Sequence, residues 1–126
     1  MIKGADKMAL ITDAMRAAGT DATESILGAK DTGVPVVIKD GVAQLPDFSS
    51  YAGSVGTMDN ALRVVHQNYG VSLVDTVKMM SLTPARIIGI DKTKGSLSVG
   101  KDADIVVMDD SFTVKDVYVC GQKIDI

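Results

Sequence analysis

The first apolar segment of the chain, residues 8–12 ("MALIT"), shows no alternation of apolar and polar positions. A continuous apolar run of this length is typical of a strand covered on both faces, as in a parallel sheet with helices outside. A parallel strand needs neighbouring strands, and no second run of this kind follows nearby. The pattern therefore predicts the end of a larger sheet, most of which precedes this chain.

Shorter β-rich runs predict antiparallel strands further along. Residues 34–45 hold two such runs around an Asp-Gly pair, which is a strong hairpin signal. Residues 105–109 and 114–121 are expected to form two more strands, the second with clear alternation. The polar, glycine-containing residues 94–104 predict turns before these strands.

Three helices are predicted in the middle of the chain. Thr57 can cap the first, over residues 58–69, and Gly70 ends it. Ser72 begins the second with the capping-box-like sequence "SLVD". The apolar side chains at helical spacing on this helix are Leu73, Val77 and Met80.

The third helix is short, with Thr83 as its expected cap, Pro84 as its first residue and Gly89 at its end. The resulting order is one buried strand, a hairpin, helices and final strands, with no internal repeat. With 126 residues the chain is long enough for one domain with a modest core.

Composition narrows the functional classes. The net charge is -3 and neither sign is clustered, which gives no electrostatic footprint for nucleic acid or an anionic membrane. No apolar stretch approaches the roughly 20 residues of a membrane span, and residues 1–4 do not lead into a signal peptide, so a cytoplasmic protein is expected. The 46% hydrophobic content and mean hydropathy of +0.20 predict exposed apolar surface that favours homo-oligomers.

Asp13 is the first candidate for chemistry, because it directly follows the predicted buried strand. An aspartate at such a place is more often a turn former or a helix cap. The alternative is catalytic, since the catalytic groups of (β/α) barrels sit at the carboxyl ends of the strands. Spacing alone leaves both interpretations open.

Residues 51–56 ("YAGSVG") are the second candidate. Ser54 lies between small residues ahead of a helix, as in the nucleophile elbow of serine hydrolases, but Ala52 stands where that motif has glycine. The only histidine, His66, falls on the next helix and is interpreted as structural, which argues against a Ser/His/Asp triad. The small residues form either a plain turn or a place where backbone N–H groups meet a ligand oxygen.

The donor count argues against a complete metal centre in this chain. It has one histidine and one cysteine, whereas a zinc site needs at least three protein ligands. Cys120 is interpreted as a small apolar strand residue without a functional role. The acidic residues near the C-terminus lack the spacing of a calcium loop and are expected to be solvated turn residues: Asp102, Asp104, Asp109 and Asp110.

Five segments taken together resemble the C-terminal part of the N-acetylglucosamine-6-phosphate deacetylase family, within the metal-dependent amidohydrolase superfamily. They span nearly the whole chain in order: "LITDAMRAAG", "YAGSVGTMDNALR", "SLTPARIIGI", "KGSLSVGKDADIVVMD" and "VYVCG". The fourth is common to many amidohydrolases, whereas "TDAM" with the later "AGS" and "TMDNA" points to the deacetylases. The implied fold is α/β, with the last strand and helices of a (β/α)8 TIM barrel in residues 1–95 and strands of a small β-sandwich domain in residues 96–126.

The resemblance implies that Asp13 is the catalytic aspartate beside the metal and could itself contact it. It also implies a loop that contacts an amino-sugar phosphate largely through main chain: Tyr51, Ala52, Gly53 and Ser54. Relatives commonly have leucine in place of Tyr51, so only the backbone contact is carried over there. The divalent metal of the full-length protein would be zinc or iron. Its glutamate and histidine ligands, and the residues that bind the phosphate, would lie upstream of this chain. No cofactor is therefore expected here.

In that family the aspartate is a general base toward the hydrolytic water and then a general acid toward the leaving amine. The pKa of a carboxyl group, about 4, lies about 12 units below that of bulk water, so moving a proton from bulk water to the carboxylate costs roughly 16 kcal/mol. A metal lowers the pKa of its bound water and reduces this difference to about 3 units, roughly 4 kcal/mol. This chain alone is therefore expected to be inactive. Two alternatives stay open: a stand-alone binding or structural module with amidohydrolase-like elements, and an amidohydrolase of cyclic-amide specificity.

Overall fold

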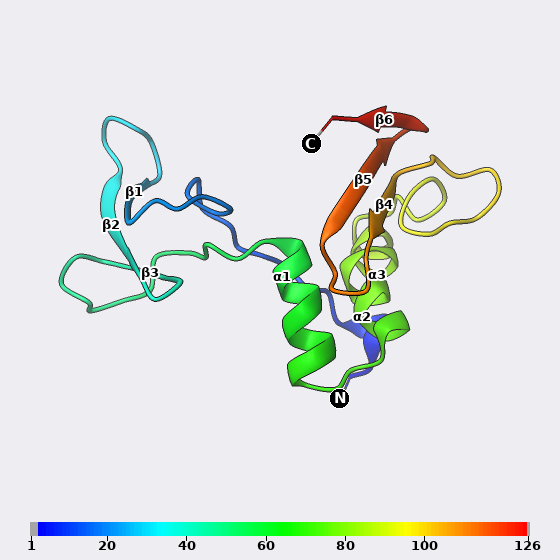
Figure 1. Cartoon of the computed structure of the whole chain (residues 1–126), viewed down its shortest axis with the longest axis horizontal. Helices are drawn as coiled ribbons and strands as arrows, with labels where there is room; N and C mark the ends of the chain where they lie inside the picture. Colours follow the sequence, from blue (N-terminus) through cyan, green and yellow to red (C-terminus); the bar gives the residue numbers. More distant parts are fainter. Residues whose placement is uncertain (1–2, 126) are drawn as a thin grey trace. The chain divides into compact units, whose positions relative to one another are not determined.

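The structure, a computed structural model, describes residues 3–125. Its helices and strands fall into two units, one formed by residues 12–58 and the other by the chain before and after that segment (Figure 1). Within the described residues each unit carries one three-stranded antiparallel sheet, and the helices follow the first sheet in sequence. The fold is thus a mixture of helices and antiparallel sheets, while the barrel assignment and the boundary at residue 95 stay predictions.

The first sheet is built around the predicted hairpin. β2 (Val34–Lys39) and β3 (Val42–Gln44) pair antiparallel across Asp40 and Gly41, which confirms the prediction. These turn residues have φ of 53° and 76°, as a type I′ turn requires to match the twist of the strands. β1 (Glu24–Leu27) pairs with the other side of β2 and was missed, because four residues without alternation give no strand signal.

A small apolar core holds this first unit together. Its buried side chains come from the segment after Asp13, from β2 and β3, and from the residue before Gly53. They are Met15, Ala17, Val36, Ala43 and Ala52. Three of the five are alanines, and burial contributes only about 0.8 kcal/mol per CH₂ group, so the apolar stabilisation of this unit is small.

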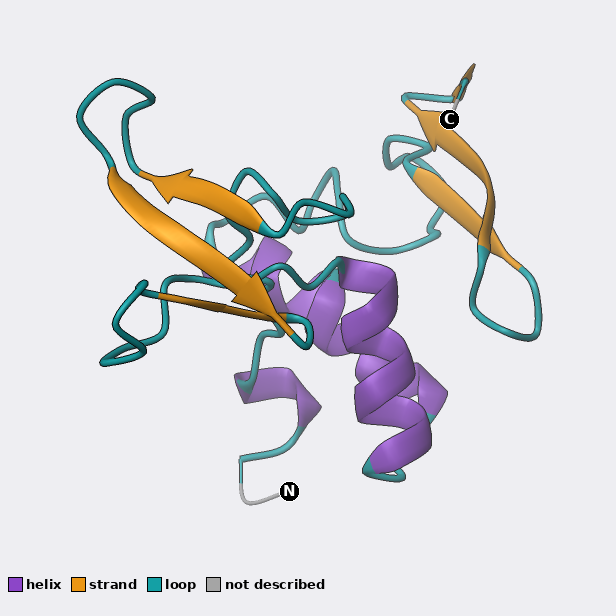
Figure 2. Ribbon diagram, turned by 60° about the vertical axis from the view of Figure 1, so that its left-hand side comes forward, coloured by secondary structure: helices purple, strands orange, loops and turns teal. Residues whose placement is uncertain are grey.

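The helices follow the predicted order along the chain. Figure 2 shows them in purple and the strands in orange. α1 (Met58–Arg63) continues as a π-helical turn, η2 (Val64–Asn68), and ends before the predicted glycine. α2 (Leu73–Met80) begins as predicted, because the Ser72 hydroxyl accepts the Asp75 N–H at 3.1 Å. Within residues 3–125 no helix is long and apolar enough to cross a membrane.

The buried face of α2 differs from the predicted apolar stripe. Leu73 and Val77 are 42% and 43% exposed, whereas Thr76 and Met79 are buried. Thr76 can be buried because its hydroxyl donates to the Ser72 carbonyl at 3.0 Å, which satisfies the polar group inside the helix. Hydrophobic spacing alone therefore does not identify which side chains of this short helix are buried.

α3 (Leu82–Ile87) begins two residues earlier than predicted, so Thr83 lies inside the helix and is not its cap. Thr83 is buried, and its hydroxyl donates to the Ala5 carbonyl at 2.6 Å. This tertiary bond uses the hydroxyl that a cap would turn toward the helix backbone. The end of the helix agrees with the prediction, because Gly89 follows with φ of 75°.

Residues 8–12 are irregular, and the predicted buried strand is wrong. After the 3-10 turn η1 (Ala5–Lys7), the Leu10 N–H donates to the Met79 carbonyl at 2.9 Å, and Ile11 is 76% exposed. A parallel strand needs a ladder partner, and this segment has none among the residues that the structure describes. It is held on α2 by a backbone hydrogen bond instead.

The second sheet contains β4 (Ile105–Met108), β5 (Val114–Val119) and β6 (Gln122–Ile124) in that order. β4 and β5 confirm the two predicted strands. Cys120 is not a strand residue: it has φ of 50°, is exposed, and forms the turn between β5 and β6 with Gly121. The prediction failed because Cys-Gly is not one of the usual Asn-Gly or Asp-Gly hairpin signals.

Asp109 organises the turn between β4 and β5. Its carboxylate accepts the Ser111 hydroxyl at 2.6 Å and the Thr113 N–H at 2.9 Å, and it pairs with Lys115 Nζ at 2.9 Å. These interactions, that of Ser111 first, hold the pKa of Asp109 well below its usual value of 3.8. Asp109 is therefore a turn residue, as predicted, and its charge supports the turn.

Replacing Thr83 by valine tests the buried bond to Ala5. Valine keeps the shape but leaves the Ala5 carbonyl without its donor, so the free energy of unfolding in urea should fall by about 1–3 kcal/mol. Thr83→Ser keeps the hydroxyl and should lose less. The matched control is Thr93→Val, which removes an exposed hydroxyl that donates to the Ile90 carbonyl at 3.3 Å. Equal losses for the two valine variants would contradict this role.

Asp109→Asn should lower stability at neutral pH, and the deficit should shrink in acid. Because the folded-state pKa is depressed, the carboxylate stabilises the fold above its unfolded pKa, and that contribution is lost as the pH falls through the folded pKa. The thermal midpoints of wild type and variant should therefore approach each other from about pH 5 to pH 2. Asp110→Asn, at an exposed neighbour, is the control. A constant gap for Asp109→Asn would rule this explanation out.

Candidate functional site

The two candidate segments, which are far apart in sequence, lie side by side within the first unit. The Ser54 N–H donates to the Asp13 carbonyl at 2.9 Å, and the Met15 N–H donates to the Ser54 carbonyl at 2.8 Å. The two bonds make a parallel bridge between Ala14 and Ser54. The backbone of Asp13 and that of residues 51–54 therefore form one local structure.

Asp13 has a left-handed backbone conformation, with φ of 48°. Non-glycine residues in this region are uncommon, cost about 1 kcal/mol or more, and cluster at functional sites. The Thr12 hydroxyl accepts the Ala14 N–H at 3.3 Å and so spans Asp13. The side chain is exposed, and its carboxylate makes no hydrogen bond or ion pair within residues 3–125. The backbone is fixed while the carboxylate oxygens stay available.

Gly53 lets the loop backbone approach Asp13 closely. Its φ is 74°, and a Cβ built on it would lie 3.4 Å from the Asp13 carbonyl oxygen and 3.6 Å from Met15 Cβ. The positive φ is the reason that glycine suits this position. Its N–H has no acceptor in the described part of the chain, so one backbone donor stays available beside Asp13.

The rest of this loop is fixed on the first sheet. Ala52 is buried, and its N–H donates to the Ala43 carbonyl of β3 at 3.0 Å. Tyr51 is 78% exposed. The Ser54 hydroxyl accepts the Gly56 N–H at 2.9 Å and thus stabilises the turn, which supports the interpretation that Ser54 is not a nucleophile.

His66 has structural partners in the other unit. Its Nδ1 donates to the Val71 carbonyl at 2.7 Å, and its ring meets Phe112 edge-on with centroids 5.5 Å apart. Both contacts support the interpretation of a structural histidine.

The metal that the resemblance implies finds no complete ligand set here. Among residues 3–125 no three histidine, cysteine, aspartate or glutamate side chains are grouped so that they could hold a metal ion. Asp102 and Asp104 instead share the ammonium of Lys94, at 3.0 and 2.5 Å. The described residues therefore do not fit the zinc or iron site of a full-length enzyme.

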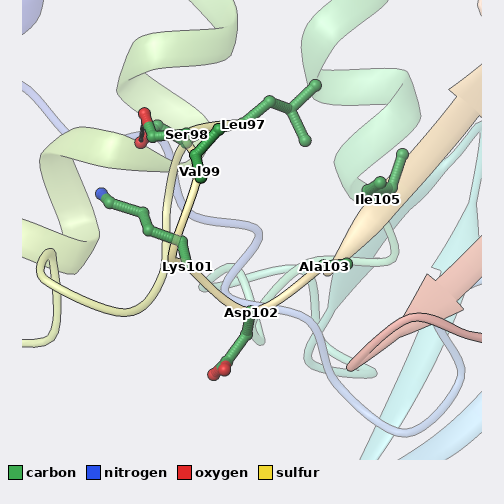
Figure 3. Close-up of a pocket in the computed structure, with 8 residues that line it drawn as sticks. Leu97, Ser98, Val99, Lys101, Asp102, Ala103 and Ile105 are labelled. Atoms are coloured by element: carbon green, nitrogen blue, oxygen red, sulfur yellow. Dashed lines mark hydrogen bonds between the residues drawn. The ribbon is translucent and has the colours of Figure 1, made fainter.

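A shallow hollow of about 250 Å³ lies at the start of β4 (Figure 3). Leu97 and Val99, both largely exposed, contribute to its apolar lining. The side chains of Lys101 and Asp102 point away from each other in Figure 3, and Lys101 Nζ donates to the backbone carbonyls of Asp91 and, at 3.1 Å, Lys94. Because this ammonium holds its own loop, the hollow offers no pair of catalytic groups.

A second hollow, of about 350 Å³, lies next to the candidate substrate loop. We name it the Phe48 hollow; its lining residues are Gln44, Phe48, Ser49, Ser50 and Tyr51. Only Tyr51 is a candidate from the sequence. The other four lie in a loop and at a strand end, where no periodicity or motif marks a residue as functional.

The chain is similar to known proteins over nearly all of its length. The model of the amidohydrolase family matches residues 6–124. The N-acetylglucosamine-6-phosphate deacetylase of Rattus norvegicus is 36% identical over 117 residues, which are 93% of this chain and 28% of the rat protein. The N-acetylgalactosamine-6-phosphate deacetylase of Escherichia coli O157:H7 is 35% identical over 118 residues, 93% of this chain and 30% of that protein.

The crystal structure of N-acetylglucosamine-6-phosphate deacetylase from Pasteurella multocida agrees with the fold. It superposes with a TM-score of 0.86 at 30% identity, and the match covers 94% of this chain and 30% of that chain. The chain thus spans less than a third of the length of these relatives. Because the family model and the superposition both extend over nearly all of its residues, the chain belongs to the amidohydrolase family.

Proposed function

We propose that this chain forms the part of an N-acetylglucosamine-6-phosphate deacetylase that carries the catalytic aspartate and a main-chain contact to substrate. The whole enzyme would hydrolyse the acetamide to glucosamine 6-phosphate and acetate. The observation that carries the proposal is the backbone pairing of Asp13 with Ser54, in a chain that aligns over more than 90% of its length with such deacetylases.

Asp13 would perform the acid–base chemistry. An exposed carboxylate without a partner in the described residues can accept a proton from the water that attacks the acetyl carbonyl. The same group would return that proton to the sugar nitrogen as the C–N bond breaks. The fixed backbone on both sides of Asp13 supports this role, because a general base must stay within hydrogen-bond reach of its proton.

Gly53 would contribute the main-chain contact. Its free N–H lies on the segment that pairs with Asp13, so a donor and a base are close in the backbone. A backbone N–H can bind the acetyl oxygen and stabilise the negative charge that develops on it during attack. Glycine also leaves room for a ligand to approach the backbone.

The class of substrate follows from the relatives. They are named as deacetylases of N-acetylglucosamine 6-phosphate and of N-acetylgalactosamine 6-phosphate. Both are phosphates of N-acetylated amino sugars. We favour the glucosamine form because the rat and Pasteurella multocida proteins both carry that name.

The complete reaction needs groups that the described residues lack. Within residues 3–125 no metal-ligand cluster exists, so we propose that the ligands of zinc or iron and the phosphate-binding groups come from polypeptide outside this chain. We assign residues 1–95 to the end of a TIM barrel and residues 96–126 to the strands of a small β domain, in a cytoplasmic enzyme.

A chimera tests the role of Asp13. In it, this chain replaces the matching region of the Pasteurella multocida deacetylase, and acetate release from N-acetylglucosamine 6-phosphate is measured with zinc or iron present. The chimera should turn over. Asp13→Asn should lower kcat by about 10²- to 10⁴-fold, because positioned acid–base groups contribute that much.

Two controls accompany this experiment. The chain alone should release no acetate under the same conditions. In the chimera, Asp21→Asn removes an exposed carboxylate of the same unit and should leave kcat unchanged. Full activity of the Asp13→Asn chimera, or enzyme-like turnover by the chain alone, would refute the proposal.

The isolated chain should self-associate. Many large apolar side chains in the described residues are at least two-thirds exposed, and such surface favours association in water. They are Ile11, Tyr51, Tyr69, Val74, Ile87, Ile88, Leu97 and Val99. Sedimentation velocity should show dimers or larger species whose share grows with concentration. A monomer that unfolds cooperatively would favour the alternative function, a stand-alone binding or structural module.

A further inference from the structure

The peptide group between Asp13 and Ala14 is held at both of its polar atoms. Its carbonyl oxygen, on Asp13, accepts the Ser54 N–H at 2.9 Å. Its N–H, on Ala14, donates to the Thr12 hydroxyl at 3.3 Å. One hydrogen bond leaves a peptide group free to turn about the bonded atom, whereas bonds on two sides fix its plane. The orientation of this peptide group is therefore set by Thr12 and Ser54 together.

The fixed peptide group holds Asp13 in its left-handed conformation. With φ of 48°, Asp13 lies in a region that non-glycine residues seldom occupy, and such strain persists where surrounding contacts over-determine the backbone. A rotation of Asp13 toward a relaxed, negative φ would turn the peptide group away from one of its two partners. Because the Cβ atom moves with such a rotation, the same two bonds determine the direction in which the carboxylate leaves the backbone.

A second Thr-Asp-Ala tripeptide provides an internal comparison. Residues 20–22 repeat the sequence of residues 12–14, and the Thr20 hydroxyl accepts the Ala22 N–H at the same distance of 3.3 Å. Asp21 does not have a positive φ, and its carbonyl accepts no backbone N–H within residues 3–125. The threonine bond alone therefore does not produce the left-handed conformation, and a bond on the other side of the peptide group is needed as well.

The chemistry of Thr12 suits this task. A threonine hydroxyl can accept the N–H two residues further along the chain, and the branched side chain restricts χ1. Ala14 is exposed, so water can replace the hydroxyl as the partner of the Ala14 N–H. A mobile water molecule would satisfy this N–H without fixing the peptide plane. The hydroxyl is therefore needed for orientation more than for stability.

We propose that Thr12 is a positioning residue, whose hydroxyl acts with the Ser54 N–H to set the direction of the Asp13 carboxylate. The inference rests on the proposed function, in which Asp13 moves a proton between the attacking water and the leaving amine. A general base must lie within about 2.6–3.2 Å of the group whose proton it takes, and a displacement of about 1 Å can cost about 10²-fold in rate. Thr12 acts through Asp13 and does not contact the substrate.

The chimera that contains this chain tests the inference through acetate release. Thr12→Val keeps the branched shape but removes the acceptor, and should lower kcat by about 10- to 100-fold. KM should stay nearly unchanged, because a displaced base slows proton transfer and leaves the substrate contacts in place. Thr12→Ser keeps the hydroxyl and should recover most of the loss. In the Asp13→Asn chimera, Thr12→Val should cause no further loss, since Thr12 acts only through Asp13.

The matched control is Thr20→Val, which removes the same kind of bond from the second tripeptide and should leave kcat unchanged. Thr20 also donates to the Ala17 carbonyl at 2.9 Å, so this control should cost at least as much stability, which thermal midpoints will check. A loss of kcat confined to Thr12→Val would then not come from instability. The inference is overturned if both valine variants have the same kcat, if Thr12→Ser loses as much as Thr12→Val, or if Thr12→Val lowers kcat further in the Asp13→Asn chimera.

Amide hydrogen exchange, followed by NMR on the whole chain, gives a readout that does not depend on activity. The Ala14 amide should exchange faster in Thr12→Val, whereas the Ser54 amide should keep its protection because the pairing with Asp13 survives. Unchanged exchange at Ala14 would contradict the role of the hydroxyl. Full kcat of the Asp13→Asn chimera would mean that the proposed function fails. A large loss for Asp13→Asn with full kcat for Thr12→Val would mean that this inference alone fails.

Discussion

The backbone pairing between Asp13 and Ser54 is the constraint on which the candidate site depends. Two hydrogen bonds join segments that are far apart in sequence, and they place a free carboxylate and a free Gly53 N–H on adjacent stretches of chain. Neither segment is part of a regular strand, so no ladder would hold them without these bonds. The small core around Met15 and Ala52 buries the residues next to this pairing.

Local rules were sufficient wherever a short stretch determines its own backbone. The Asp40-Gly41 pair predicted the β2–β3 turn, since both residues tolerate the positive φ that a tight hairpin demands. Ser72 predicted the start of α2, because its hydroxyl reaches a backbone N–H only three residues away. The resemblance to deacetylases likewise rested on short motifs, including the one around Asp13, and the comparisons support the family.

Tertiary partners decided the elements that the sequence could not predict. Residues 8–12 have the composition of a buried strand, but without a neighbouring strand in the described residues their backbone bonds to α2. Thr83 is a residue type that often caps helices, but its hydroxyl donates to the carbonyl of Ala5, which is far away in sequence. The Phe48 hollow was equally invisible, since it forms only when Gln44 and Tyr51 come together across a loop.

Five non-glycine residues of the described chain have a positive φ, and their surroundings show which of them have a structural reason for it. Asp40 and Cys120 each begin a two-residue hairpin turn, where the twist of the strands demands that conformation. Phe112 gains a ring contact from its position. Asp13 and Phe48 lie in no hairpin turn of that kind, and among the described residues their side chains make no hydrogen bond, ion pair or ring contact. Because backbone strain at non-glycine residues clusters at functional sites, Asp13 is the strained residue that best suits the chemistry that we propose, since its carboxylate is exposed.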